Sequence, residues 1–507
     1  MELELRKDYI NCWENVFKTT LAQEETTEMI VPDARPDILQ MLDGEGRLLL
    51  KRKEALDGKA ELSGLIRAAL LYQPDGESGV RSLDCVLPFS ATVESSSLSR
   101  RSQIIAIPQV QKVEVHVLNP RKILVKVSVA LDVSVYMPQS MPICPCVEDG
   151  EAYAMQQKTQ EYRSHMTVTA LEKMFHYSDV LNLPAGKSDM AELLKTRGDC
   201  ICNEAKVIGN KLVFKGEARL ELLYRSQDGV VTSAGFTLPF SQIMECDEAG
   251  EEALPQMKII FTDISCKSAD DAGRNISVEL ELLAQGTLQR TETRLVLTDL
   301  YSTKHTVEAQ QKMHPICRLM DQGIAPESVR EVLETGMAVE SILDVQVRPG
   351  QLLRNRQNGS LELGAEVEVF VLFAAEGDTV TSLHRKLIVP HHIPISDRWE
   401  YDCEFWLSRE PAAVPAREGL EISFTLDFKW AAVERSELPA ISAVTVREQE
   451  EQSGDVLPSV IIRAVRADEE LWDLAKAYHT TQAEISGANA LASAQLTSGQ
   501  MLLIPKV

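Results

Sequence analysis

The side chains that could carry chemistry fall into three groups. The first is a run of three carboxylates, Asp468, Glu469 and Glu470, directly before Leu471 and Trp472. Carboxylates at this position suit the first turn of a helix, where the helix dipole favours negative charge. They could equally form a charged rim that selects a binding partner. The run therefore predicts either a solvated helix cap or a recognition surface.

The second group consists of two Cys-x-Cys pairs, Cys144–Cys146 and Cys200–Cys202. Structural zinc sites normally leave two to four residues between paired ligands. Cys200 and Cys202 also fit one face of a strand, because side chains alternate with period two. We therefore expect reduced thiols in structural positions and no metal site.

The third group is His384, His391 and His392, close to Glu376 and Asp378. Adjacent histidines on a strand point to opposite faces, so we expect loop or edge residues rather than a catalytic pair. The sequence lacks a phosphate-binding Gly-rich loop, Gly-x-Ser-x-Gly and His-Glu-x-x-His. We therefore predict no catalytic residues and no cofactor.

Composition narrows the classes of partner. The chain has 507 residues and a net charge of −24, with 44% hydrophobic and 25% charged residues. This length predicts about three to five domains. The acidic balance argues against binding to nucleic acid or to an anionic membrane surface. The sequence has no apolar run of about 18 residues and no basic, apolar start of a secretory signal, so we expect a cytosolic protein without membrane insertion.

An internal repeat dominates the organisation of the chain. The stretches Gly64–Tyr72 and Gly216–Tyr224 are the same length, and each leads through Asp-Gly to Leu-Pro-Phe-Ser. Shared residues at nearly shared spacing indicate two copies of one unit. A more divergent third copy follows, with the landmarks Gly364–Phe373, Glu376–Asp378 and Val389–Pro390.

The sequence pattern of the repeats predicts β-structure. Apolar and polar residues alternate in the segments 113–117, 125–129, 276–282 and 424–428, which is the pattern of half-buried strands. Asp75-Gly76 and Asp228-Gly229 lie between such runs and predict hairpin turns. The expected fold class is mainly β: three tandem antiparallel domains, followed by a small C-terminal βααβ domain.

A few segments favour helices instead. Ile10–Leu21 has an amphipathic pattern, Ala325–Thr335 has Ser328 and Glu331 placed as a capping box, and Met166–Phe175 is a weaker candidate. The predicted division of the chain is a helical segment at 1–30, β-domains at 31–155, 156–310 and 311–446, an acidic linker at 447–458 and the terminal domain at 459–507.

The sequence pattern of the terminal domain predicts the order strand, helix, helix, strand. Ile461–Val465 and Met501–Ile504 predict the strands, with a turn at Gly499. Asp468 is placed to cap the first helix, and Thr481 with Glu484 forms a capping box for the second, which we expect to end at Asn489. Trp472 is expected in the core of this small domain.

This order, with Leu471–Ala475, Asn489-x-Leu491 and Gly499–Pro505, resembles the LysM family. LysM modules usually bind N-acetylglucosamine-containing glycans in a groove between the loop before the first helix and the loop before the last strand. The resemblance places this groove at Ala467, Asp468, Glu469, Glu470, Leu471, Ala490, Leu491, Ala492 and Ser493. The family usually has Gly-Asp-Thr where this chain has Asp468–Glu470. Because glycine admits a sugar close to the backbone and three carboxylates do not, we favour a protein partner over a glycan.

The repeats resemble the SPOCS domains of endospore-coat proteins, through Val31–Asp37 and the two Tyr…Asp-Gly…Leu-Pro-Phe-Ser series. Three such repeats before one LysM module resemble the SipL type of spore-coat morphogenesis protein of clostridia. The resemblance implies a non-enzymatic protein of the mother-cell cytoplasm at the forespore surface. It also implies a contact between the LysM module and the coat basement-layer ATPase, stage IV sporulation protein A, with other coat proteins as further partners. The alternatives are a peptidoglycan-binding protein of cortex or wall and a wall hydrolase with a LysM tail.

Overall fold

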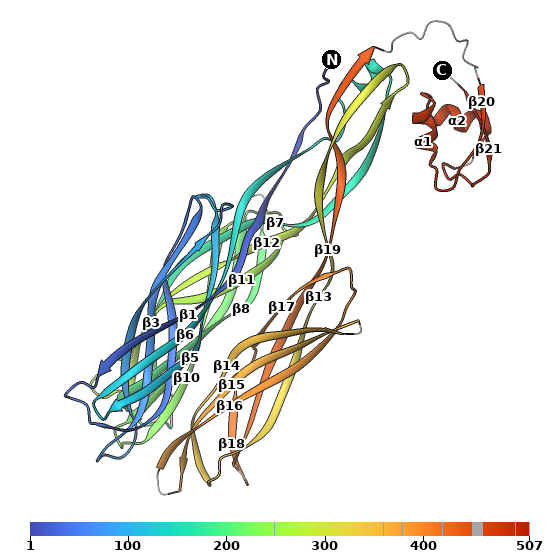
Figure 1. Cartoon of the computed structure of the whole chain (residues 1–507). Helices are drawn as coiled ribbons and strands as arrows, with labels where there is room; N and C mark the ends of the chain where they lie inside the picture. The colour runs from blue at the N-terminus through green and yellow to red at the C-terminus, as the bar shows by residue number, and fades with distance from the viewer. Residues whose placement is uncertain are drawn as a thin grey trace.

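In the computed structural model, the described residues are 1–247, 249–357, 359–376, 379–417, 419–448, 460–491 and 493–505. Up to residue 448 these residues form antiparallel sheets of long strands, and both α-helices lie in the terminal module. The long strands run from broad lobes into a narrow bundle, and the terminal module stands beside the far end of that bundle (Figure 1). The prediction of a mainly β protein with a small βααβ domain is confirmed.

The first two repeats share one topology, in which six strands form two three-stranded sheets. In each repeat the first, sixth and fifth strands make one sheet, and the second, third and fourth make the other. The strands of the first repeat are β1 (Asp8–Ile30), β2 (Ile38–Leu56), β3 (Lys59–Pro74), β4 (Arg81–Glu94), β5 (Gln103–Asn119) and β6 (Lys122–Ile143). After the 3-10 turn η1 (Gly150–Tyr153), those of the second are β7 (Met155–Asn182), β8 (Met190–Ile208), β9 (Lys211–Ser226), β10 (Val231–Glu245), β11 (Leu254–Ser268) and β12 (Asn275–Ser302).

The third repeat follows the same plan although its sequence landmarks are divergent. Two short strands, β17 and β18, both pair with the last strand in the place of the single fifth strand of the other repeats. The elements are β13 (His305–Glu334), β14 (Val339–Gln357), β15 (Ser360–Ala375), β16 (Thr379–Pro394), β17 (Glu400–Leu407), β18 (Ala412–Ala416) and β19 (Gly419–Glu448). The boundary expected at 310/311 falls inside β13. Residues 447 and 448 of the expected linker end β19, and 449–458 lie outside the described residues.

The three expected helices in the repeats are wrong. Ile10–Leu21 lies in β1, Met166–Phe175 in β7 and Ala325–Thr335 in β13, so residues 1–30 are not a helical segment. From Thr19 to Ile30, half-buried and exposed residues of β1 alternate one by one, which is the pattern of a strand. A register shift between Asn15 and Phe17 interrupts this alternation in the first half of the strand. The pairing of β1 along the whole length of β6 therefore overrides the local preference for a helix.

The Leu-Pro-Phe-Ser motif has a structural explanation. Its two copies lie in β4 and β10, and Val389-Pro390 lies at the matching place in β16; all three are edge strands. In the first copy Leu87 and Phe89 are buried and Pro88 between them is exposed. Proline offers no N–H to an incoming strand, so the motif fills the core while it protects a sheet edge from pairing with other chains.

The three repeats meet at a buried ionic cluster, here called the hub: Asp43, Glu45, Lys195, Arg197, Asp344 and Arg348. Lys195 Nζ lies 2.6 Å from Asp344 Oδ2, 3.0 Å from Glu45 Oε2 and 3.3 Å from Asp43 Oδ2. The side chain of Lys195 is 2% exposed and that of Asp344 1%. These groups come from β2, β8 and β14, the second strands of the three repeats, and each strand has a register shift just before its hub residue. The hub therefore joins all three repeats.

Electrostatics and apolar packing support each other at the hub. Burial opposes charge there, but Lys195 and Arg197 outweigh it and lower the pKa of Asp344 to about 2. The surrounding carboxylates likewise raise the pKa of Lys195 against the effect of burial. An apolar cluster from all three repeats packs alongside, made of Leu42, Leu71, Val80, Leu194, Leu223, Val231, Phe370 and Leu372.

Removing the central cation should destabilise the whole assembly of repeats. Lys195→Met leaves three carboxylates without their shared partner, and breaking a buried ionic network by removing one member typically costs about 3–5 kcal/mol. We expect a clear fall in the first thermal or urea unfolding midpoint. The matched control is Lys215→Met, whose exposed pair with Glu204 should contribute about 0–1 kcal/mol. Equal midpoints for the two variants would contradict a stabilising hub.

The hub also predicts acid sensitivity. A carboxyl group with a lowered pKa in the folded state stabilises the fold above its unfolded pKa of about 3.9 and loses that contribution as pH falls. For Asp344 the loss should run from about pH 4 down to the folded pKa of about 2. Unfolding midpoints measured across this interval should fall more steeply for the wild type than for Asp344→Asn.

Candidate functional site

The terminal module is built as the sequence predicted. Its strands β20 (Val460–Ala464) and β21 (Met501–Pro505) form an antiparallel pair, with α1 (Leu471–Ala477) and α2 (Gln482–Asn489) between them in the chain. Alternate residues of β21 point inward, where Leu502 and Ile504 are buried with Leu474 of α1 and Ile485 of α2. The βααβ order and this shared core are confirmed.

Helix α2 is fixed at both ends by side chains. Thr481 accepts a hydrogen bond from the Glu484 N–H, and the Glu484 carboxylate accepts one from the Thr481 N–H, which confirms the predicted capping box. Asn489 ends the helix as expected. Its amide also donates to the Leu503 carbonyl at 2.6 Å and accepts from the Leu503 N–H at 2.7 Å, so it ties α2 to β21.

The carboxylate run differs from the expected cap. Helix α1 begins at Leu471 with Glu470 as its N-cap residue, and Asp468 has a left-handed backbone with φ of 61°. Glu469 is already neutralised inside the module, because its carboxylate lies 2.5 Å from Arg463. Glu470 pairs with Lys158 of β7 at 2.6 Å. Two of the three expected rim charges therefore have partners within the chain.

The nine expected groove residues separate by burial. Leu471 is buried and Leu491 packs against the module core, so neither presents a free side chain to a groove. Glu469 is half-buried, and Ala492 lies outside the described residues. The exposed members of the expected rim are Ala467, Asp468, Glu470, Ala490 and Ser493. The role of these residues in binding stays a prediction.

The structure adds a contact that sequence reasoning missed, between α1 and the end of β12. The indole N–H of Trp472 donates to Asp299 Oδ2 at 2.8 Å, and Lys476 Nζ lies 2.6 Å from Asp299 Oδ1. The ring of Tyr301 meets the ring of Trp472 edge-on, with centroids 5.0 Å apart. Trp472 is thus a core residue, as expected, but part of that core belongs to the second repeat.

Further polar contacts hold the module against the second repeat. The whole set of contacts between α1 and its flanking residues and the end of β12 is here called the dock. The Tyr301 hydroxyl donates to the Thr480 carbonyl at 2.8 Å in a buried position, and burial raises the pKa of Tyr301 to about 12. Burial opposes the ionisation of Asp299, but the hydrogen bonds from Lys476 and Trp472 outweigh it and lower its pKa. In addition, His479 Nδ1 lies 3.1 Å from the Ser302 carbonyl oxygen, and Lys158 pairs with Glu470.

The cysteines and histidines considered for chemistry take structural places. Cys200 and Cys202 lie in β8 and both pack against the core of the second repeat, as the strand interpretation predicted. His391 lies in the edge strand β16, but its ring is buried against Phe428, with Nδ1 2.8 Å from Glu327 Oε1. Within the described residues no group of three or more His, Cys, Asp or Glu is arranged to hold a metal ion.

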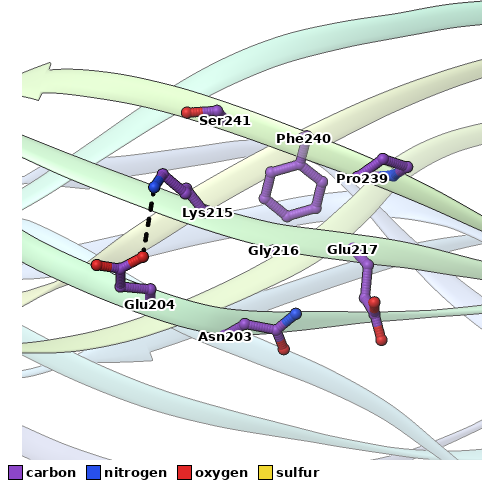
Figure 2. A pocket seen from close by; sticks show the side chains of 8 residues that line it. All are labelled: Asn203, Glu204, Lys215, Gly216, Glu217, Pro239, Phe240 and Ser241. Atoms are coloured by element: carbon purple, nitrogen blue, oxygen red, sulfur yellow. Dashed lines mark hydrogen bonds and ion pairs between the residues drawn. The ribbon is translucent and has the colours of Figure 1, made fainter.

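A surface hollow of about 510 Å³ lies over β9 and β10 (Figure 2). Gly216 lines this hollow, and its position excludes a larger residue, because a Cβ there would lie 2.1 Å from the Ile201 carbonyl oxygen and 2.7 Å from the Phe240 ring. The hollow contains one exposed ion pair, between Lys215 and Glu204 at 3.4 Å, and the Phe240 ring. Shared Gly216 therefore serves close packing of strands rather than chemistry.

Asn489→Ala should loosen the module and leave the repeats intact. The change removes the hydrogen bonds between α2 and β21 and leaves the Leu503 N–H and carbonyl without their partner, at a typical cost of about 1–3 kcal/mol. Amide hydrogen exchange on the full chain should accelerate in residues 482–505 and stay unchanged in β12. Gln482→Ala, at the half-buried start of the same helix, serves as control; comparable exchange in both variants would contradict the role of Asn489.

Comparison with protein-family models identifies two regions of the chain. Residues 189–268 match the SipL SPOCS domain and residues 464–505 match the LysM domain. The first match covers β8 to β11 of the second repeat, and the second covers the module described above. No curated protein and no solved structure matches the chain. No helix in the described part of the chain is long and apolar enough to cross a membrane.

Both domain types are non-catalytic binding domains. A LysM domain is compatible with glycan binding, and a SPOCS domain is associated with protein interactions in the spore coat. The chain therefore has a region that matches the SipL SPOCS domain ahead of a C-terminal region that matches the LysM domain, and this combination suggests a sporulation protein associated with the coat.

Proposed function

We propose that this chain is a non-enzymatic morphogenetic adaptor of the spore coat. Its LysM module docks on the coat basement-layer ATPase, stage IV sporulation protein A, and its repeats support encasement of the forespore from the mother-cell cytoplasm. The observation that carries the proposal is the joining of a SPOCS domain and a LysM domain in one chain. The hub supports it, because three repeats held by one buried ionic cluster form a firm base for a module that binds another protein.

Deletion of residues 459–507 tests the role of the module. In sporulating cells the truncated chain, fused to a fluorescent protein, should lose its recruitment to the forespore, because the partner contact is removed. The repeats of the truncated chain should unfold at the same midpoint as in the full-length chain, because the hub is unchanged. Full recruitment of the truncated chain would rule out the module as the contact with the coat.

A single rim substitution gives a milder test. Asp468→Asn removes the charge while it keeps a side chain that tolerates the left-handed backbone at this position. An exposed ion pair is worth about 0.2–1 kcal/mol, so co-purified ATPase should fall by up to about fivefold and become less sensitive to salt. Asp228→Asn, in an exposed hairpin turn of the second repeat, is the matched control.

Glycan binding is the second candidate function. It is favoured by the internal pairing of Glu469 with Arg463 and of Glu470 with Lys158, which leaves the rim less charged than the sequence predicts. A pull-down on purified peptidoglycan separates the two functions. Retention that resists salt and is competed away by soluble chitin oligomers would support the glycan, whereas retention of the ATPase alone would support the adaptor.

A further inference from the structure

The dock covers the face of α1 that has the chemistry of a protein-binding site. One carboxylate, that of Asp299, receives both the Trp472 indole N–H and the Lys476 ammonium. The Tyr301 ring packs on the same indole. Tryptophan and tyrosine dominate binding energy at protein interfaces, since they bury a large apolar area and still offer a polar group. The contact therefore resembles a protein–protein hot spot made within one chain.

The dock is separable from the fold of the module. Among the described residues, the apolar cluster of the module contains one side chain from the repeats, that of Tyr301. Ala475, Leu474, Ile485 and Leu502 are almost fully buried among residues of the module itself. Release from β12 would thus expose Trp472 while most of the module core stays covered. A module released from β12 would therefore lose one side chain, Tyr301, from its described apolar cluster.

We propose that the end of β12 covers a protein-binding face of the LysM module, and that the released face binds a partner presenting a carboxylate beside an aromatic ring. The partner's carboxylate replaces Asp299 between Trp472 and Lys476, and its ring replaces Tyr301. This inference rests on the proposed function for the identity of the partner, but not for the existence of the covered face.

Competition from the end of β12 lowers the apparent affinity of the module for a partner. A tethered surface competes at an effective concentration of about 1 mM, so a partner gains access only in proportion to the released fraction of molecules. If the dock is closed in about nine molecules of ten, opening it should increase the apparent affinity for a partner about tenfold. Variants that remove Asp299 should accordingly bind better than the wild type, which distinguishes a cover from a contact that helps binding.

Two complementary full-length variants test the covered face with this chain alone. The double variant Asp299→Ala with Tyr301→Ala releases an unaltered module. The double variant Trp472→Ala with Lys476→Ala releases an unaltered end of β12, even if these two changes perturb the module of that chain. With about 0.3 mM of each chain, above the dissociation constant of about 0.1 mM that this closed fraction and effective concentration imply, the mixture should form a 1:1 complex in analytical ultracentrifugation, whereas each variant alone and the wild type should not. A chain with Asp321→Ala replaces the first variant as the control, because Asp321 accepts the indole N–H of Trp430 at 3.0 Å within the third repeat.

The outcomes separate the two proposals. Absence of a complex in the mixture, or an equal complex with the Asp321→Ala control, overturns the covered face. Tighter capture of the ATPase by Asp299→Ala than by the wild type supports it, whereas measurable capture of equal strength by the two chains overturns it. If neither chain captures the ATPase while the mixture still forms its complex, the proposed function fails and the covered face stands.

Discussion

The ammonium group of Lys195 can be buried only because three carboxylates from two other repeats surround it. Taking a single ion out of water costs several kcal/mol, and among the described residues of the second repeat none supplies a carboxylate to the ion pairs of Lys195. Asp43 and Glu45 come from the first repeat and Asp344 from the third. The second repeat alone would therefore leave this charge unpaired, and the requirement to pair it makes the three repeats one structural unit.

This requirement explains which features the sequence revealed. Matching the repeats to one another finds residues that every copy needs in the same form, such as the edge proline and the hairpin Asp-Gly. The hub works in the opposite way: Asp43, Lys195 and Asp344 follow the same register shift in each repeat, and the lysine of the second repeat must be opposite in charge to the aspartates of the other two. A search for shared residues cannot detect positions that function by being different.

The wrong helices have a related cause. Phe17 and Leu21 are four residues apart, as are Val329 and Leu333, and a spacing of four places two side chains on one face of either a helix or a strand. Local spacing could not decide between them. The strands β6 and β19 decide, since each pairs along the whole length of β1 or β13, and such long-range pairing is not visible in a short window of sequence. In the terminal module the two strands, the two helices and the capping box of α2 lie within fifty residues, so local signals were sufficient for these features.

The same distinction changes the interpretation of the module's surface. The sequence predicts a charged rim at 468–470 because the cations that pair with it are not its immediate neighbours: Arg463 lies six residues before Glu469, in β20, and Lys158 lies in the second repeat. Once both are placed, Asp468 remains as the exposed charge of the run without a salt bridge among the described residues. Charge at the rim then gives a weaker reason to prefer a protein over a glycan. The stronger reason lies on α1, where Trp472 and Lys476 already hold a carboxylate and an aromatic ring supplied by a protein strand.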